Sequence, residues 1–311
     1  MRAVLLALTL PALLGLWPGP RPKADCAPPL AAAWGHSGAL GAAMAVYEAA
    51  VLSYPSGVAV GPGRTVYIVD TDNAAVLQVS PLGHLSTLAS AGLTYPTGIA
   101  VDSSGTVYVA DAGTRSLKKI SPQGELSTLL ANAFVYPTGV AVAPDGTVYV
   151  VDAGSGAAAG LVKKMTLAGR VSTLASGFNK PSGVAVAPDG TVYVADTDNN
   201  SIKKIAPDGT VSTVAQEGLN KPHGVAVDAT GAVYVTDTYN NSVRKLLPTG
   251  AMVSLAQDLA YPSGIAIDAT GTVYVADTGH AALKKISAAG SISTLADSST
   301  VAATSVRTAQ N

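Results

Sequence analysis

A tripeptide of proline, any residue and glycine occurs six times in this chain at almost constant spacing. Successive prolines are 41, 41, 44, 41 and 40 residues apart. A fixed period near 40 residues is typical of repeat proteins, in which each copy forms one supersecondary unit. The chain therefore consists mainly of six repeats within residues 55–296. Their first residues are Pro55, Pro96, Pro137, Pro181, Pro222 and Pro262.

Each repeat contains four short runs typical of β-strands. The most regular copy begins at Pro181 and reads PSGVAVAPDGTVYVADTDNNSIKKIAPDGTVSTVA. Its runs GVAV, TVYVAD, SIKKI and VSTVA are rich in β-branched residues and alternate larger with smaller or polar ones. Turn sequences such as PDG separate the runs, and their glycine permits the positive φ of a tight hairpin. Because no segment has helical periodicity, each repeat is predicted to be one four-stranded propeller blade.

Six such blades predict an all-β fold, a six-bladed β-propeller of repeats about 41 residues long. Apolar residues make up 48% of the chain but aromatic residues only 5%, so the core must consist of Val, Ala, Ile and Leu. A ring of blades covers both faces of every sheet and leaves only short outer edges. Two segments are candidates for closing the ring. Either Ser291–Ala296 completes the sixth blade alone, or Ala43–Ala49 joins it from the N-terminal side.

The repeat unit P-x-G-V-A-V-x-x-x-G-x-V-Y-V-A-D-T-x-N-N-x-I-K-K resembles the NHL-repeat family of β-propellers. The resemblance extends over all six copies, and it implies a six-bladed propeller without implying one function. Proteins of similar sequence include extracellular sensor domains of bacterial receptor kinases, RNA- and protein-binding domains, and the zinc lyase that completes peptide amidation. Gluconolactonase-like hydrolases are more distant six-bladed relatives.

The segments outside the repeats divide into a leader, a linker and a tail. Residues 1–25 begin with Arg2 and continue into an apolar run that is interrupted by Pro11. Such a run is short for a membrane span and typical of an export signal, so we expect a secreted, periplasmic or cell-surface protein. Residues 26–54 are a linker with a candidate ring-closing strand, and residues 297–311 are a tail. Cys26 is the only cysteine, which excludes an internal disulfide, and KADC before it lacks the residues expected ahead of a lipidated cysteine.

Charge is almost balanced over the chain, with 19 basic and 20 acidic residues. There is therefore no overall attraction to nucleic acid or anionic membranes. Five repeats nevertheless carry a basic pair in the third run. Such pairs would attract an anionic polymer, or they would pack their stems over blade edges with their charges in water. We favour the second interpretation, and a shortage of exposed aromatic residues also disfavours nucleic acid. The pairs are Lys118/Lys119, Lys163/Lys164, Lys203/Lys204, Arg244/Lys245 and Lys284/Lys285.

One aspartate ends the second run of every repeat. A ring of six carboxylates could bind Ca²⁺, which prefers several oxygen ligands. A residue present in every copy more simply serves folding, by accepting hydrogen bonds from the backbone of its own turn. We expect this structural role. The six residues are Asp70, Asp111, Asp152, Asp196, Asp237 and Asp277.

Departures from the repeat are the better candidates for a ligand site. In a propeller the Pro-x-Gly turns and the loops after the second strands share one face, around one mouth of the central channel. His223 occupies a Pro-x-Gly position that otherwise holds Ser or Thr, and Tyr239 lies in the same blade. This pair could bind a polar ligand or assist proton transfer. The predicted ligand-binding residues are His223, Tyr239, Arg115, Asp72 and His280.

No enzyme class is indicated by these residues. A three-histidine zinc site is not expected, because only His223 and His280 belong to the mouth face. No nucleophile elbow or phosphate-binding loop is present, and we assign no catalytic residue, metal or cofactor. The leading hypothesis is an exported, monomeric scaffold that binds a protein, peptide or glycan at this face. The alternatives are a metal-assisted lyase or lactonase acting at the channel mouth, and a purely structural protein of the cell surface.

Overall fold

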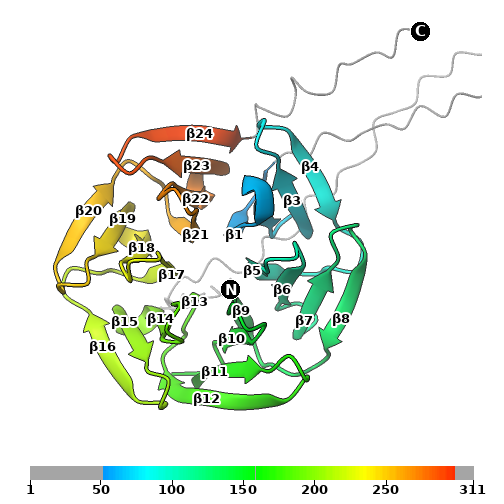
Figure 1. The fold of residues 1–311 in the computed structure, drawn as a ribbon, viewed down its shortest axis with the longest axis horizontal. Helices are drawn as coiled ribbons and strands as arrows, with labels where there is room; N and C mark the ends of the chain where they lie inside the picture. Colours follow the sequence, from blue (N-terminus) through cyan, green and yellow to red (C-terminus); the bar gives the residue numbers. More distant parts are fainter. Residues whose placement is uncertain (1–51, 158, 298–311) are drawn as a thin grey trace, which may run out of the picture. The chain divides into compact units, whose positions relative to one another are not determined.

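A ring of six four-stranded antiparallel sheets forms the propeller (Figure 1), which confirms the predicted fold class. The computed structural model describes residues 52–157 and 159–297. Within these residues the regular structure is strand apart from four single turns of 3₁₀-helix, η1 to η4. No helix in this part of the chain is long and apolar enough to cross a lipid bilayer. The 3₁₀ turns are Pro62–Arg64, Thr197–Asn199, Thr238–Asn240 and Thr278–His280.

Every blade is one uninterrupted stretch of chain, with its strands ordered from the axis outward. Blade one contains β1 (Pro55–Val60), β2 (Val66–Asp70), β3 (Ala75–Val79) and β4 (Leu85–Ala89). Blade two contains β5 (Pro96–Val101), β6 (Val107–Asp111), β7 (Ser116–Ile120) and β8 (Leu126–Leu130). Blade three contains β9 (Pro137–Val142), β10 (Val148–Asp152), β11 (Gly160–Met165) and β12 (Val171–Phe178).

The second half of the ring repeats this arrangement. Blade four contains β13 (Val184–Val186), β14 (Val192–Asp196), β15 (Ser201–Ile205) and β16 (Val211–Ala215). Blade five contains β17 (Pro222–Val227), β18 (Val233–Asp237), β19 (Ser242–Leu246) and β20 (Met252–Ala256). Blade six contains β21 (Pro262–Ile267), β22 (Val273–Asp277), β23 (Ala282–Ile286) and β24 (Ile292–Asp297).

Blade six is completed by its own fourth strand. β24 pairs with β23, and β1 of blade one packs directly against β21. Of the two predicted closing segments, Ser291–Ala296 therefore supplies the outer strand of blade six, while Ala43–Ala49 lies outside the described residues. The predicted leader, most of the linker and most of the tail also lie outside them.

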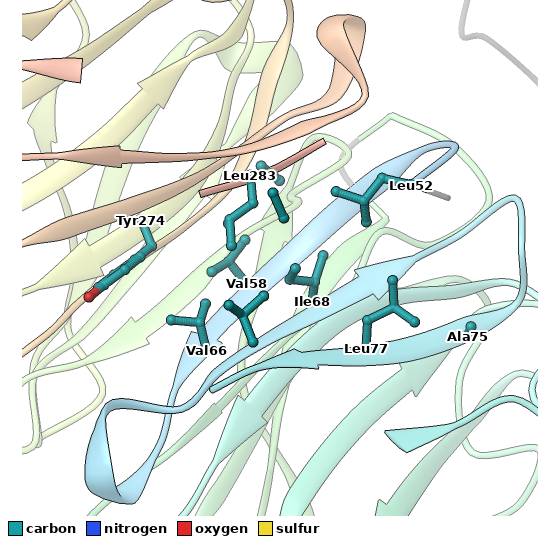
Figure 2. Close-up of a cluster of buried hydrophobic side chains, with 11 residues drawn as sticks. Leu52, Val58, Val66, Ile68, Ala75, Leu77, Tyr274 and Leu283 are labelled. Atoms are coloured by element: carbon teal, nitrogen blue, oxygen red, sulfur yellow. The ribbon is translucent and has the colours of Figure 1, made fainter. Parts of the chain in front are cut away.

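Side chains of neighbouring blades fill the space between the sheets. At the junction of blades six and one, Tyr274 and Leu283 pack against Val58, Ile68 and other residues of blade one (Figure 2). Ile68 and Leu283 are fully buried there. Because each sheet is covered on both faces, its second strand is apolar at almost every position instead of alternating with polar residues. This explains how a core with few aromatic residues suffices: six similar interfaces bury mainly Val, Ile, Leu and Ala.

The basic pairs lie on the third strands, which are interior strands of the blades. The predicted location at blade edges is wrong, because the fourth strand forms the outer edge of each sheet. Lys203 Nζ donates a hydrogen bond to Thr213 Oγ1 (2.6 Å) on the neighbouring strand. Lys245 Nζ lies 4.7 Å from the ring centroid of Tyr234 within its own blade. The ammonium groups of these two lysines therefore interact within their own blades, as expected for side chains whose aliphatic stems pack on the sheet.

Candidate ligand-binding mouth

The Pro-x-Gly turns and the loops after the second strands meet at one end of the ring. Strand register pairs Pro55 with Asp70 in blade one and Pro222 with Asp237 in blade five. The predicted grouping of these segments on one face is thus correct. We call this end of the channel the mouth. It comprises the Pro-x-Gly turns, the residues that precede them, and the loops after β2, β6, β10, β14, β18 and β22.

The channel is narrow where the first strands of the blades meet. A cavity of about 60 Å³ lies there, lined by Ser56, Thr97, Thr138, Ser182, His223 and the glycines that follow them. This volume holds a few water molecules, whereas pockets for organic ligands are typically several hundred Å³. A larger ligand would therefore bind on the mouth and not inside the channel.

Hydroxyl groups in the middle position of Pro-x-Gly connect adjacent blades. Ser56 Oγ donates to the carbonyl of Thr97 (3.0 Å) in the next blade, and Ser182 Oγ donates to the carbonyl of His223 (2.7 Å). Ser263 Oγ closes the ring by donating to the carbonyl of Ser56 (3.0 Å). The Ser or Thr of this position is therefore a structural residue that links blades through their backbones.

Blade five keeps this link although His223 has no hydroxyl group. Thr236, on the adjacent strand β18, donates to the carbonyl of Ser263 (2.7 Å) and accepts the N–H of Gly224 (2.7 Å). The neighbouring Thr238 donates to the carbonyl of Pro262 (2.8 Å). In blade five, Thr236 therefore makes the hydrogen bond between blades, and the side chain of His223 takes no part in it. The other blades have no hydroxyl at the position of Thr236, which is occupied by Val69, Ala110, Val151, Ala195 and Ala276.

His223 is half-buried and lines the axial cavity. Within the described part of the chain, its ring nitrogens form no hydrogen bond with a protein group. Burial disfavours the charged imidazolium and lowers the pKa of His223 to about 4. The imidazole is therefore neutral near pH 7, with one nitrogen able to donate and the other able to accept.

The structure does not join His223 to Tyr239 by a hydrogen bond or a ring contact. The Tyr239 ring instead packs edge-to-face against Tyr261 of blade six, with 5.7 Å between ring centroids and 87° between ring planes. Both tyrosines are about half exposed, at 49% and 56%. Two blades thus share an aromatic pair at the mouth, separate from the imidazole at the axis.

The six repeated aspartates are buried and have a structural role. Asp196 Oδ1 accepts the N–H of Asn179 (2.7 Å), and Asp237 Oδ1 accepts that of Asn220 (2.7 Å). The predicted partners are largely wrong, because most of these N–H groups belong to the loop 16 or 17 residues earlier and not to the turn after the aspartate. The carboxylates therefore bind the backbone of the segment that precedes the first strand to the end of the second strand. For Asp70, burial raises the pKa despite these bonds.

His280 occupies a position that three other blades fill with asparagine. Asn199 and Asn240 donate their side-chain amides to the aspartate three residues before them, at 2.8 Å in both cases. His280 Nδ1 contacts Asp277 Oδ2 in the same way, also at 2.8 Å. One nitrogen of this histidine is therefore engaged by a local structural bond, although half of the side chain is exposed.

The other two predicted site residues are exposed at the mouth. Arg115 Nε donates to the carbonyl of Phe134 (3.0 Å), in the segment that leads into blade three. Burial raises the pKa of the Tyr54 and Tyr95 phenols, and the charge of the nearby Asp72 carboxylate makes a smaller contribution in the same direction. Asp72 thus belongs to an electrostatic cluster on blades one and two, whereas Arg115 ties two blades together.

The residues immediately before the six prolines are functional candidates that sequence reasoning missed. They are large, and they lie around the mouth next to the first strands. The sequence could have indicated them, because a Tyr or Lys stands directly before every Pro-x-Gly tripeptide. The expected shortage of exposed aromatic residues is wrong at this end of the molecule, where Tyr239 and Tyr261 are accessible. The six residues are Tyr54, Tyr95, Tyr136, Lys180, Lys221 and Tyr261.

Tyr95 shows how closely these residues approach one another. Burial raises its pKa to about 12, and the neighbouring Tyr136 contributes through electrostatic interaction and a side-chain hydrogen bond. Neighbouring blades therefore bring their tyrosines together at the mouth. In residues 52–157 and 159–297, no group of three His, Cys, Asp or Glu side chains converges as a metal site would require.

Comparison with known families identifies the repeat. The NHL repeat model matches residues 52–78, 93–120, 178–205, 219–246 and 259–286. These segments cover strands one to three of five blades. The unmatched copy is blade three, which carries three more residues than the regular repeat. A search of curated proteins finds no significant match.

Several solved structures share the fold at low sequence identity. A streptogramin B lyase is 16% identical with a TM-score of 0.61, over 78% of this chain and 82% of its own. A gluconolactonase from Xanthomonas campestris is 21% identical with a TM-score of 0.64, over 72% and 83%. The nidogen/laminin complex contains a chain 22% identical with a TM-score of 0.60, over 65% and 79%. Because enzymes and a protein complex occur together among them, the fold alone does not indicate an activity.

Proposed function

Since this chain belongs to the NHL-repeat family of six-bladed β-propellers, we propose that it is a binding scaffold whose mouth holds a protein, peptide or glycan ligand. The scaffold acts outside the cytoplasm, as the leader-like residues 1–25 suggest. It works as a monomer, because the blades complete one another's interfaces within a single chain.

The observation that supports this proposal is the composition of the mouth. Four tyrosines and two lysines precede the prolines, and Tyr239 adds a fifth aromatic ring. Tyrosine offers a large contact area with few rotatable bonds, and it is enriched at binding surfaces for this reason. Tyr239 and Tyr261 are half exposed, so packing against the repeat does not account for these two side chains. Their accessibility is what a binding role requires.

Direct binding measurements test the proposal. Purified protein is immobilised and probed with a glycan array and a displayed peptide library, beside a variant carrying Tyr239→Ala and Tyr261→Ala. We expect at least one ligand class to bind the native protein and to be lost from the variant. The control is Leu82→Ser in the hairpin between β3 and β4, at the opposite end of the blade, where Leu82 is 83% exposed. Ligands that bind both variants normally would exclude the mouth as the binding site.

The metal-assisted lyase or lactonase requires a separate test. Elemental analysis of the purified protein, with and without His223→Ala, measures any tightly bound Zn²⁺ or Ca²⁺. A stoichiometric ion that disappears with His223 would overturn the scaffold in favour of this alternative. We expect the two proteins to contain the same trace amounts.

A further inference from the structure

Blades four to six form a distinct part of the mouth with one shared loop geometry. Lys180, Lys221 and Tyr261 have left-handed backbone conformations, with φ of 44°, 50° and 46°. Side-chain amides of the preceding blade hold two of them, since Asn200 Oδ1 accepts the N–H of Lys221 (2.8 Å) and Asn241 Oδ1 that of Tyr261 (2.9 Å). Such conformations are uncommon outside glycine and persist where surrounding bonds enforce them.

We call Lys180, Lys221, Tyr239 and Tyr261 the recognition arc. They lie on three consecutive blades, and the loop backbone under Lys221 and Tyr261 is fixed by the amide bonds of Asn200 and Asn241. A surface that is held in place before binding loses less entropy when a ligand binds. The arc is thus a prepared contact surface and not a set of independent side chains.

The lysine half of the arc has more positive than negative charge. Lys180 Nζ and Lys221 Nζ lie 3.2 and 3.0 Å from the two carboxylate oxygens of Asp198. Two ammonium groups therefore share one carboxylate, and one positive charge remains without compensation. Both lysine side chains are accessible, at 48% and 36%. A carboxylate from a ligand would neutralise the remaining positive charge. Two lysines and two carboxylates would then form two ion pairs.

The tyrosine half of the arc favours a side chain over a sugar ring. The rings of Tyr239 and Tyr261 meet nearly perpendicular to each other, at 87°. They consequently do not form the flat platform on which a sugar ring would stack. An edge-to-face pair instead leaves an angle between its rings in which an apolar or aromatic side chain makes contact with both.

Nucleic acid fits the same arc less well. Binding a phosphate backbone relies on neutralising several phosphates, whereas the arc offers one surplus positive charge.

We propose that the recognition arc binds an acidic polypeptide segment. One carboxylate of the segment pairs with Lys180 and Lys221, and an apolar or aromatic side chain nearby packs against Tyr239 and Tyr261. This inference rests on the proposed scaffold function and specifies the ligand class of that site. Neither half of the arc suffices alone, because exposed ion pairs contribute little and a single aromatic contact is not selective.

The test begins with a phage-displayed library of random dodecapeptides, selected on the immobilised protein. We expect enriched sequences to combine Asp or Glu with an aromatic or aliphatic residue a few positions away. A synthetic copy of one enriched peptide is then titrated against the protein and four variants. K180Q/K221Q and Y239A/Y261A should each bind at least tenfold more weakly, and added salt should weaken binding to the native protein.

A matched control removes the same charge elsewhere. K203Q/K204Q changes two lysines of blade four on strand β15, away from the mouth, and should keep the dissociation constant within twofold. Circular dichroism and melting curves confirm that each variant is folded. A K180R/K221R variant keeps both charges, and it should retain most of the affinity.

Three results would overturn the inference. One is the absence of any enriched peptide; another is an enriched peptide that binds K180Q/K221Q and Y239A/Y261A as well as the native protein. The third is arc-dependent binding of a glycan, heparin or single-stranded oligouridylate in place of peptide. Arc-dependent glycan binding would still leave the scaffold function intact. If neither peptides nor glycans bind in a way that depends on the mouth, the scaffold function fails as well.

Discussion

The hydroxyl of Thr236 donates a 2.7 Å hydrogen bond to the carbonyl of Ser263 in the next blade. In blades one, four and six, the equivalent bond comes from the serine in the position of His223. The protein has therefore preserved the link between blades five and six by moving the hydroxyl to the adjacent strand. The imidazole of His223 lines the channel without a hydrogen bond to the described part of the protein, which separates it from a surface residue that has merely lost a hydroxyl.

This relationship predicts an energetic coupling between Thr236 and His223. Thr236→Ala removes two buried hydrogen bonds and should lower the free energy of unfolding by about 2 kcal/mol. In a His223→Ser background the new serine can supply the link, so the same change should cost about 1 kcal/mol less. Urea denaturation of the four proteins measures the cycle. Losses that simply add would show that the two positions do not share this task.

The repeated aspartates are predicted to stabilise the fold. Asp196→Ala leaves the N–H of Asn179 and the amide of Asn199 without their acceptor, and we expect a loss of about 3 kcal/mol. Asp72→Ala, on an exposed carboxylate of blade one, is the matched control and should change stability by less than about 0.5 kcal/mol. Urea denaturation measures both. Equal effects of the two substitutions would contradict a special role for the buried ring.

The lowered pKa of His223 predicts a specific loss of stability in acid. Its folded pKa, about 4, lies below the unfolded value of 6.5, so the unfolded chain binds the proton first. Stability should therefore fall as pH drops from about 6.5 to about 4, by about 3 kcal/mol at most. His223→Ser should lack this component. The measurement is the difference in unfolding free energy between the two proteins at pH 7 and pH 4.5, and a constant difference would disprove it.

The blades approach closely at the axis, and we therefore expect replacement of Gly183 by a larger residue to destabilise the fold. A Cβ atom there would collide with the carbonyl oxygen of His223 in blade five. Because backbone must move to relieve this collision, Gly183→Ala should cost about 3 kcal/mol. Gly156→Ala is a suitable control, since its Cβ would meet no atom within 4 Å. Thermal melting of both variants tests this, and equally stable proteins would refute it.

The blades were predictable because their signals are local. The period of the prolines, the four β-type runs and the turn glycines each depend on residues close together in sequence. The alternating direction of the strands then places every Pro-x-Gly turn on the same face as the loop after the second strand. This rule alone predicts the position of the mouth.

Partners across blades were not predictable in the same way. The bond from Asn179 to Asp196 spans 17 residues, and that from Thr236 to Ser263 spans 27. Similarly, the sequence shows Tyr239 as a departure within blade five and Tyr261 as one of four tyrosines that precede a repeat proline, whereas the structure packs the two rings into one aromatic pair. The basic pairs were correctly predicted on the third strand, but their stems were expected over blade edges, which β4 and its equivalents occupy.

The sequence by itself determined the number of blades, the order of their strands and which loops face the mouth. It did so because strand formation and turn geometry depend on short-range periodicity and on glycine and proline. Only the tertiary structure decided which mouth residues act together. Ring closure packs blade five against blade six, so that the hydroxyl of Thr236 reaches the carbonyl of Ser263 and replaces the bond from the position of His223. The same closure places two lysines around Asp198 and joins two tyrosines from different blades.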